Sequence, residues 1–251
     1  MMKLFCSDMD NTLIYSYKRP MGTDRICVEI YQGREVSFMS RYSFDSLKEI
    51  CKRYLFVPTT TRSLEQYERI DLGIGCPEYA LVCNGGVLLK NGRRDRKWYE
   101  GSLEETARAR AGVPAAWKLL ESDPDRCFEV RNVENLFLFT KSSPPEKTME
   151  HLEQVLDPEE NDILSNGIKV YVVPAKLNKG RALIRLKEHL HIHEAIAAGD
   201  SRFDLSMLKA ADRAFAPESL SVEPGMDGNT TYFGGDLLFS DQLIRRLLEN
   251  K

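Results

Sequence analysis

Residues 3–13 read KLFCSDMDNTL, and this stretch decides the fold. Its first half is a short apolar run, and its second half begins abruptly with Ser7, Asp8 and Asp10. A short apolar run bounded by turn-forming residues is typical of a strand buried in a parallel sheet. Asp8 and Asp10 are two residues apart, so an extended backbone places both side chains on the same side. The stretch therefore predicts a buried strand that delivers two carboxylates at its carboxyl end.

The same pattern recurs along the chain. Apolar runs at 55–57, 79–83 and 192–198 each end in a polar, turn-forming segment. Strands that alternate with helices form a parallel sheet with helices on both faces, so the predicted fold class is α/β with a Rossmann-like parallel-sheet core. The other expected elements are a hairpin at 26–38, a helix that Ser43 caps and that runs to about Arg53, helices from about 179, around 205–208 and at 237–249, and a strand at 213–215.

The pattern changes between about residues 88 and 175. After a hairpin at Asn91-Gly92, the order helix-strand-strand occurs twice. The expected helices are 103–121 and 146–156, and the expected strands are 127–131, 136–140, 162–165 and 169–173. This order predicts an α+β insert, a sheet with helices on one face. The expected domains are a discontinuous core, residues 1–87 and 176–251, and an inserted domain, residues 88–175.

Several core elements begin or end with residues that carry oxygen or charge. In open α/β sheets, ligands bind outside the carboxyl ends of the strands. Carboxylates that converge there cannot all ionise without a compensating cation, and Mg²⁺ prefers oxygen ligands. A lysine and a threonine beside them suit phosphoryl oxygens, because one supplies charge and the other a hydroxyl donor. The residues expected to converge are Asp8, Asp10, Thr60, Lys179, Asp200 and Asp204.

Four segments carry a resemblance to a known family. The segment DMDNTL at 8–13 resembles the DxDxT motif of the haloacid dehalogenase superfamily, and TTR at 60–62 resembles its second motif. Lys179-Gly180 and GDSRFDLSML at 199–208 resemble the third and fourth. Order and spacing match, and the insert between the second and third motifs resembles the cap of subclass IIB, the C2B type. The similarity is greatest to Cof-type sugar phosphatases and sucrose-phosphate phosphatases.

The resemblance implies a Mg²⁺-dependent phosphatase and a role for each catalytic residue. It makes Asp8 the nucleophile and a metal ligand. It makes Asp10 the acid that protonates the leaving oxygen and the base that activates water, with its backbone carbonyl on Mg²⁺. Thr60 and Lys179 are expected to hold the phosphoryl group. Positioning and charge stabilisation supply most of the rate in phosphoryl transfer, which fits these roles.

The resemblance also implies the metal and substrate ligands. Asp200 is expected to bind Mg²⁺ directly, and Asp204 to act through water or to orient Lys179. The predicted metal set is Asp8, Asp10, Asp200 and Asp204. The predicted substrate-binding set is Thr60, Thr61, Arg62, Asn84 and Lys179.

Three residues depart from the family pattern near these motifs, and one of them is Phe203, which stands where many subclass IIB members have asparagine. Asn11 and Thr61 stand where glycine is common. Asn tolerates left-handed backbone angles, whereas a β-branched residue resists positive φ. The loop at Thr61 is therefore expected to be reshaped if the family needs a positive φ there.

Composition excludes several other classes of protein. The 251 residues include 35 Lys plus Arg and 38 Asp plus Glu, a net charge of -3, which argues against a protein that coats nucleic acid or an anionic membrane. No apolar stretch approaches the ~20 residues that span a bilayer, and the N-terminal apolar run is too short for a signal peptide. The six cysteines lack ordered spacing, which favours reduced thiols in a cytoplasmic protein. The expected partner is a small phosphorylated metabolite, and the expected state is a monomer or small homo-oligomer.

Two other functions remain open at this point. A phosphomutase of the phosphomannomutase type uses the same pair, Asp8 and Asp10, but returns the phosphoryl group to substrate. A non-catalytic phosphate-binding regulator is the alternative from another class. A further hypothesis concerns the hairpin at 25–39, which we expect to lean on the inserted domain and to help shape the entrance, because a two-stranded ribbon alone is marginally stable.

Overall fold

The computed structural model describes residues 2–225 and 228–249. It divides into two compact units, Met1–Asp95 with Lys179–Lys251, and Arg96–Asn178. The sequence predicted the first domain boundary after residue 87, which is eight residues before the boundary in the structure. The reason is a small antiparallel sheet in the first unit, in which one hairpin continues past residue 87. Its strands are β6 (Tyr79–Val82), β7 (Val87–Lys90) and β8 (Arg93–Arg94).

The first unit is built on a five-stranded sheet with the order β15-β14-β13-β1-β5. Every neighbouring pair is parallel, which confirms the predicted α/β class. The central strand β1 pairs with β5 on one side and with β13 on the other, and the register places Leu4 beside Leu55 and Ala195. The strands are β1 (Lys3–Ser7), β5 (Tyr54–Pro58), β13 (Ala195–Ala198), β14 (Arg213–Pro217) and β15 (Thr230–Phe233).

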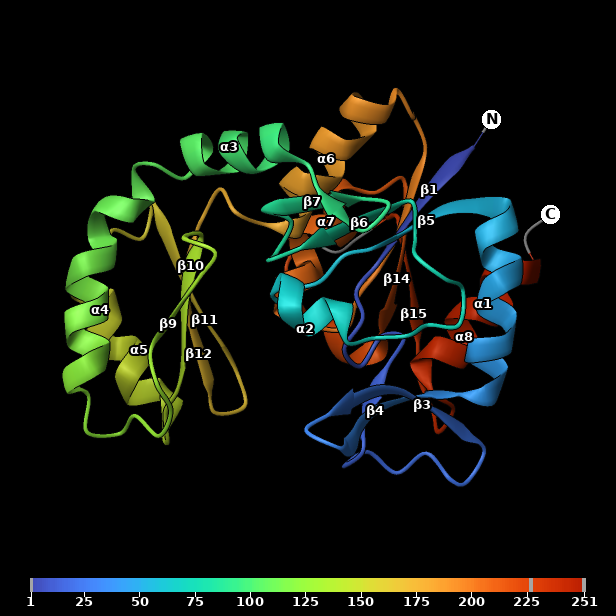
Figure 1. Ribbon diagram of the computed structural model, residues 1–251, viewed down its shortest axis with the longest axis horizontal. Coiled ribbons are helices and arrows are strands. Elements are labelled where there is room, and N and C mark those ends of the chain that lie inside the picture. Colours follow the sequence, from blue (N-terminus) through green and yellow to red (C-terminus); the bar gives the residue numbers. More distant parts are fainter. Residues whose placement is uncertain (1, 226–227, 250–251) are drawn as a thin grey trace. The chain divides into compact units, whose positions relative to one another are not determined.

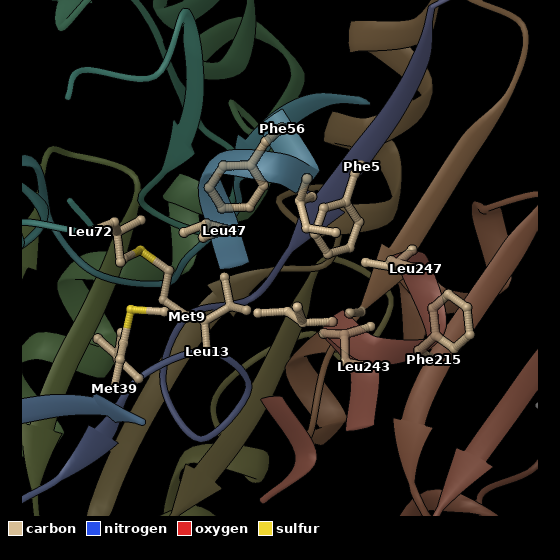
Figure 2. Packing of buried hydrophobic residues seen from close by; sticks show 14 of the residues in the cluster. Phe5, Met9, Leu13, Met39, Leu47, Phe56, Leu72, Phe215, Leu243 and Leu247 are labelled. Atoms are coloured by element: carbon tan, nitrogen blue, oxygen red, sulfur yellow. The ribbon is translucent and has the colours of Figure 1, made fainter. Parts of the chain in front are cut away.

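Helices cover both faces of this sheet (Figure 1). On one face, α1 and α8 pack together, and Leu47 and Leu243 contact a cluster that includes Phe5, Phe56 and Phe215 (Figure 2). On the other face, α6 packs against α7. Burial of aromatic and leucine side chains on this scale is the main stabilising term of such a core. The helices are α1 (Arg41–Arg53), α6 (Lys179–Leu190), α7 (Leu205–Ala210) and α8 (Phe239–Glu249).

Two helix predictions were wrong. The N-cap of α1 is Ser40, whose hydroxyl accepts a hydrogen bond from the Ser43 backbone, 3.0 Å away. Ser43 is therefore the third residue of the helix, the usual partner of an N-cap oxygen. The expected helix at 103–121 is broken, because Pro114 begins a new helix rather than continuing one. The observed elements are α3 (Arg96–Glu105), η1 (Ala109–Gly112) and α4 (Val113–Ser122).

The predicted hairpin is present, with an irregularity. The turn at Gln32-Gly33 has φ of 51° and 73°, as a two-residue hairpin turn requires. A β-bulge follows Cys27, so the alternation of side chains breaks there. Ile30, expected among the apolar positions, is 61% exposed, whereas Glu29 is buried. The strands are β3 (Arg25–Tyr31) and β4 (Arg34–Ser40), and the short β2 (Tyr15–Ser16) also pairs with β4.

The second unit is an antiparallel sheet with the order β11-β12-β10-β9. Leu120 of α4 and Leu152 of α5 pack on Leu138 and Val172 of the sheet, as expected for an α+β insert. The strand predicted at 127–131 is shifted, because only Arg131–Val133 pairs with β10 as a ladder. The elements are β9 (Arg131–Val133), β10 (Phe137–Lys141), α5 (Pro145–Glu153), β11 (Asn161–Asn166) and β12 (Lys169–Pro174). Across the described residues, no helix is long and apolar enough to cross a membrane.

Candidate active site

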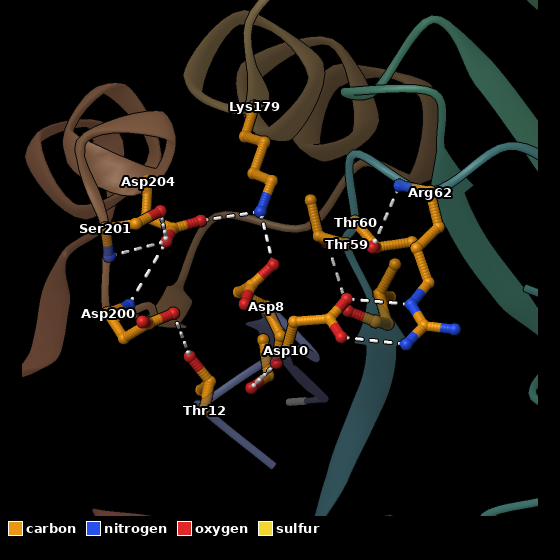
Figure 3. Close-up of polar contacts among 12 residues, drawn as sticks. Asp8, Asp10, Thr12, Thr59, Thr60, Arg62, Lys179, Asp200, Ser201 and Asp204 are labelled. Carbon is orange, nitrogen blue, oxygen red and sulfur yellow. Dashed lines mark hydrogen bonds and ion pairs between the residues drawn. The ribbon is translucent and has the colours of Figure 1, made fainter. Parts of the chain in front are cut away.

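Lys179 lies between two buried carboxylates at the carboxyl end of β1 (Figure 3). Its Nζ is 2.5 Å from Asp8 Oδ1 and 2.6 Å from Asp204 Oδ1. The side chains of Lys179 and Asp204 are 1% and 0% exposed. Asp8 follows the central strand, and its backbone N–H donates to the carbonyl of Ala198 in β13, 2.8 Å away. The structure therefore brings together residues from motifs one, three and four, which are far apart in sequence.

The loop after β13 is arranged around Asp204. Its Oδ2 accepts hydrogen bonds from the backbone of Asp200 and Ser201, at 3.1 and 3.0 Å, and from the Ser201 hydroxyl, at 2.9 Å. A Cβ at Gly199 would lie 2.3 Å from the Cβ of Asp204, so only glycine fits there. Since its other oxygen bonds Lys179, both oxygens of Asp204 are already engaged. This geometry favours the predicted role of Asp204 in orienting Lys179.

Gly180 allows α6 to approach α7 closely enough to place Lys179. A Cβ at Gly180 would lie 2.2 Å from the backbone oxygen of Ser206. The Gly180 backbone N–H also donates to the Ser206 hydroxyl at 3.1 Å. The Lys179-Gly180 motif thus has a physical basis, because the glycine brings the start of α6 against the helix that follows Asp204.

The donor set fits a hard divalent cation. Carboxylate oxygens of Asp8, Asp200 and Asp204 all lie within 4.8 Å of one another. Lys179 is the cation that contacts two of these groups, which leaves negative charge uncompensated. Oxygen ligands at one point are what Mg²⁺ prefers. The side chain of Asp10 is not part of this cluster of described residues, and the expectation that its backbone carbonyl binds the metal stays a prediction.

The crowded carboxylates have perturbed ionisation. Burial raises the pKa of Asp8 well above its usual range, Lys179 opposes this, and the neighbouring carboxylates add to it. Burial, followed by the charge of Asp204, raises the pKa of Asp200 to about 7. Burial alone would lower the pKa of Lys179, but Asp204 and Asp8 raise it overall, so this side chain stays charged.

The raised pKa of Asp200 gives a testable pH dependence for the metal-free protein. Between the ordinary pKa near 4 and about 7, the folded state binds more protons than the unfolded state. The contribution to stability is therefore present below about pH 4 and is lost as the pH rises through about 7. We expect the free energy of unfolding to fall by on the order of 4 kcal/mol over this range because of Asp200.

Urea unfolding in EDTA at several pH values, for wild type and Asp200→Asn, measures this effect. The variant is expected to show a smaller decrease. The same pH dependence in both proteins would contradict the assignment.

Arg62, which is predicted to bind substrate, contacts two carboxylates in the structure. Its Nε and NH2 donate to the two carboxylate oxygens of Asp10, at 2.7 and 2.8 Å (Figure 3). Its NH1 lies 2.9 Å from Glu29 Oε1. Burial alone would lower the pKa of Arg62, but these two partners raise it. The two-pronged geometry fixes the orientation of the Asp10 side chain.

The remaining predicted substrate ligands lie on two adjoining loops. Thr60 is fully buried, and its hydroxyl accepts a hydrogen bond from the Arg62 backbone at 3.1 Å. The Asn84 backbone N–H donates to the Thr60 carbonyl at 2.9 Å, which joins the loops after β5 and β6. Among the described residues with positive φ, Asn11 appears with φ of 60° and Thr61 does not. The loop at Thr61 therefore keeps ordinary backbone angles without glycine.

Three residues at the site were missed as site residues in the sequence. The Thr12 hydroxyl donates to Asp200 Oδ1 at 3.2 Å. Ser201 binds Asp204, as described above. Thr12 and Ser201 stand inside the motifs, so their position was a usable signal. Glu29 had no such signal, because it lies in the hairpin and is turned inward by a β-bulge.

A family model supplies the deciding comparison. The model of the haloacid dehalogenase-like hydrolases matches residues 117–219, a range that contains Lys179, Asp200 and Asp204. This segment of the chain is similar to the haloacid dehalogenase-like hydrolases. The predicted recognition and the prediction of an enzyme of this type are confirmed, and the α+β insert agrees with subclass IIB. No curated protein matches the chain by sequence.

Solved structures show that the haloacid dehalogenase fold extends over the whole chain. The sucrose-phosphatase from Synechocystis, solved with sucrose and phosphate, has a TM-score of 0.67 at 16% identity and covers 98% of both chains. A haloacid dehalogenase-like hydrolase from B. subtilis has a TM-score of 0.57 at 18% identity, covering 100% of both. A trehalose-6-phosphate phosphatase related protein has a TM-score of 0.57 at 15% identity, covering 98% of this chain and 96% of the other.

Proposed function

We propose that this hydrolase is a Mg²⁺-dependent phosphomonoesterase that acts on a small phosphorylated metabolite through a phospho-aspartate on Asp8. The observation that carries the proposal is the buried arrangement of Lys179 between Asp8 and Asp204, with Asp200 close by. A carboxylate held beside a fixed ammonium group suits attack on phosphorus, because the ammonium group stabilises charge on the transferred phosphoryl group.

The proposed reaction has two half-reactions. First, Asp8 attacks the phosphorus, the ester P–O bond breaks, and the leaving oxygen takes a proton from Asp10. Then water attacks the phospho-aspartate, Asp10 accepts its proton, and inorganic phosphate leaves as the Asp8 carboxylate is restored. Lys179 and Thr60 bind phosphoryl oxygens in both.

Three members of the predicted metal set, Asp8, Asp10 through its carbonyl and Asp200, are proposed to hold the metal. The fourth, Asp204, is proposed to orient Lys179. When bound, Mg²⁺ supplies positive charge that offsets the charge of the carboxylates and of the phosphoryl group. The geometry supports this, because carboxylate oxygens of Asp8, Asp200 and Asp204 lie within 4.8 Å of one another.

A sugar phosphate is the proposed substrate class. Structures of a sucrose-phosphatase and of a trehalose-6-phosphate phosphatase related protein are among those similar over the full chain, which supports this choice. The α+β insert of residues 96–178 is proposed as the cap that excludes water and large polymers. Each of the six cysteines has a free thiol, which supports the proposed cytoplasmic location.

Metal removal tests the proposed function directly. Purified protein is expected to release inorganic phosphate from p-nitrophenyl phosphate and from members of a sugar-phosphate panel in Mg²⁺. The activity should disappear in EDTA and return with excess Mg²⁺. Undiminished activity in EDTA would contradict the metal requirement, and no turnover across the panel would favour the phosphate-binding regulator. Isomerisation of a sugar phosphate without phosphate release would favour the phosphomutase.

A further inference from the structure

Glu29 is a buried carboxylate of the hairpin, and the proposed reaction does not yet use it. Its side chain is 3% exposed. It binds Arg62 at 2.9 Å and Arg69 at 3.3 Å, and the Ser37 hydroxyl donates to its other oxygen at 2.5 Å. A buried charge is stable only when it is paired and hydrogen-bonded, and Glu29 meets both conditions.

The segment that contains Glu29 is fixed to the core of its own unit. The Val28 carbonyl accepts a hydrogen bond from the Asp71 backbone at 2.8 Å, and Glu29 forms a bridge with Ile70. These contacts hold β3 beside the chain that follows α2 (Leu64–Glu68). The β-bulge then turns the Glu29 side chain inward. The backbone contacts of Val28 and Glu29 therefore fix the position of the Glu29 side chain.

Arg62 connects Glu29 to the acid–base residue. Two of its nitrogens bind Asp10, and the third binds Glu29. The Arg62 side chain is 15% exposed, whereas that of Asp10 is 48% exposed. Of the two carboxylates that Arg62 binds, Asp10 is therefore the more exposed and Glu29 the buried one. A planar guanidinium held at one edge presents the other edge in a fixed direction.

We propose that Glu29 is a positioning residue, which fixes Arg62 so that Arg62 aims the Asp10 carboxyl group at the leaving oxygen. This inference rests on the proposed function. It gives the hairpin a role in the reaction through contacts within the first unit. The separate prediction that the hairpin leans on the inserted domain and shapes the entrance stays a prediction.

Leaving-group dependence tests the proposal. Proton donation matters for an alkyl leaving group such as a sugar and matters little for p-nitrophenolate, which leaves without a proton. Glu29→Gln removes the charge with little change of shape. General acid catalysis typically raises the rate by about 10²–10⁴-fold. We therefore expect Glu29→Gln to lower kcat/KM for the sugar phosphate by about tenfold or more. For p-nitrophenyl phosphate, kcat/KM should change little.

Glu65→Gln is the matched control. Glu65 also pairs with Arg69, at 3.9 Å, but its side chain is 85% exposed. The control is expected to leave both substrates unaffected. Glu29→Asp keeps the charge and shortens the side chain, so it serves if Glu29→Gln does not fold, and it should show the same selective loss.

Two outcomes would overturn the proposal: an unchanged kcat/KM for both substrates, or an equal loss on both. Both outcomes are interpreted only after the wild-type protein has been shown to release phosphate. Absence of turnover in the wild type would instead count against the proposed function.

Discussion

Asp8→Asn is expected to lower kcat for phosphate release by at least about 10⁴-fold, the scale on which loss of a nucleophile acts. The amide cannot form the phospho-aspartate, and Asp8 is the one carboxylate that follows the central strand and contacts Lys179 directly. The fold should survive, because asparagine has nearly the same shape as aspartate. The substitution also removes a buried carboxyl group whose pKa is raised by burial. Inorganic phosphate release, with circular dichroism as a check of folding, measures the effect.

Asp45→Asn is the matched control for this prediction. Asp45 is an exposed aspartate of α1, so its substitution should leave kcat unchanged. Acid quenching of the wild type during turnover should trap phosphate on the protein, and Asp8→Asn should trap none. Retention of more than a small fraction of activity in Asp8→Asn would exclude the phospho-aspartate mechanism.

Lys179→Met is expected to reduce both stability and activity. The lysine is buried between Asp8 and Asp204, so its loss leaves two carboxylates without their shared partner. Breaking a buried ion pair in this way costs about 3–5 kcal/mol of unfolding free energy. Loss of one preorganised donor to the phosphoryl group lowers kcat by about 10²–10³-fold. Urea unfolding in EDTA and phosphate release measure the two effects.

Added Mg²⁺ separates these two effects. A cation that binds the folded carboxylates is expected to restore part of the stability of Lys179→Met, without restoring kcat. Lys187→Met is the control on the same helix, since Lys187 pairs with a half-exposed Asp212 and should cost less than about 1 kcal/mol. Equal destabilisation by the two substitutions would show that Lys179 has no special role in stability.

The parts of the site that follow from local periodicity could be predicted from the sequence. Asp8 and Asp10 follow an apolar strand directly, and Asp200 follows another such strand, so parallel topology alone brings these groups to one edge. Lys179 could be placed because it begins the helix after the insert. These inferences needed only the order of elements.

The parts that depend on contacts between elements could not be predicted. Ile30 and Val28 are apolar and two apart, which suggests one face, but the bulge exposes Ile30 and buries Glu29. Arg62 lies in a motif associated with substrate, yet its partners come from β3 and the end of β1. The edge strand Thr230–Phe233 was also missed, because a short, half-exposed strand has weak alternation.

The central position of β1 has a consequence for how the chain folds. Its two neighbours come from opposite parts of the sequence, with Leu4 beside both Leu55 and Ala195. The second pairing closes a loop of about three quarters of the chain, and such non-local contacts make folding slow. The strands of the insert pair within residues 96–178, so their ordering can shorten that loop beforehand. During synthesis, one edge of β1 therefore stays unpaired until β13 and more than three quarters of the chain have been made.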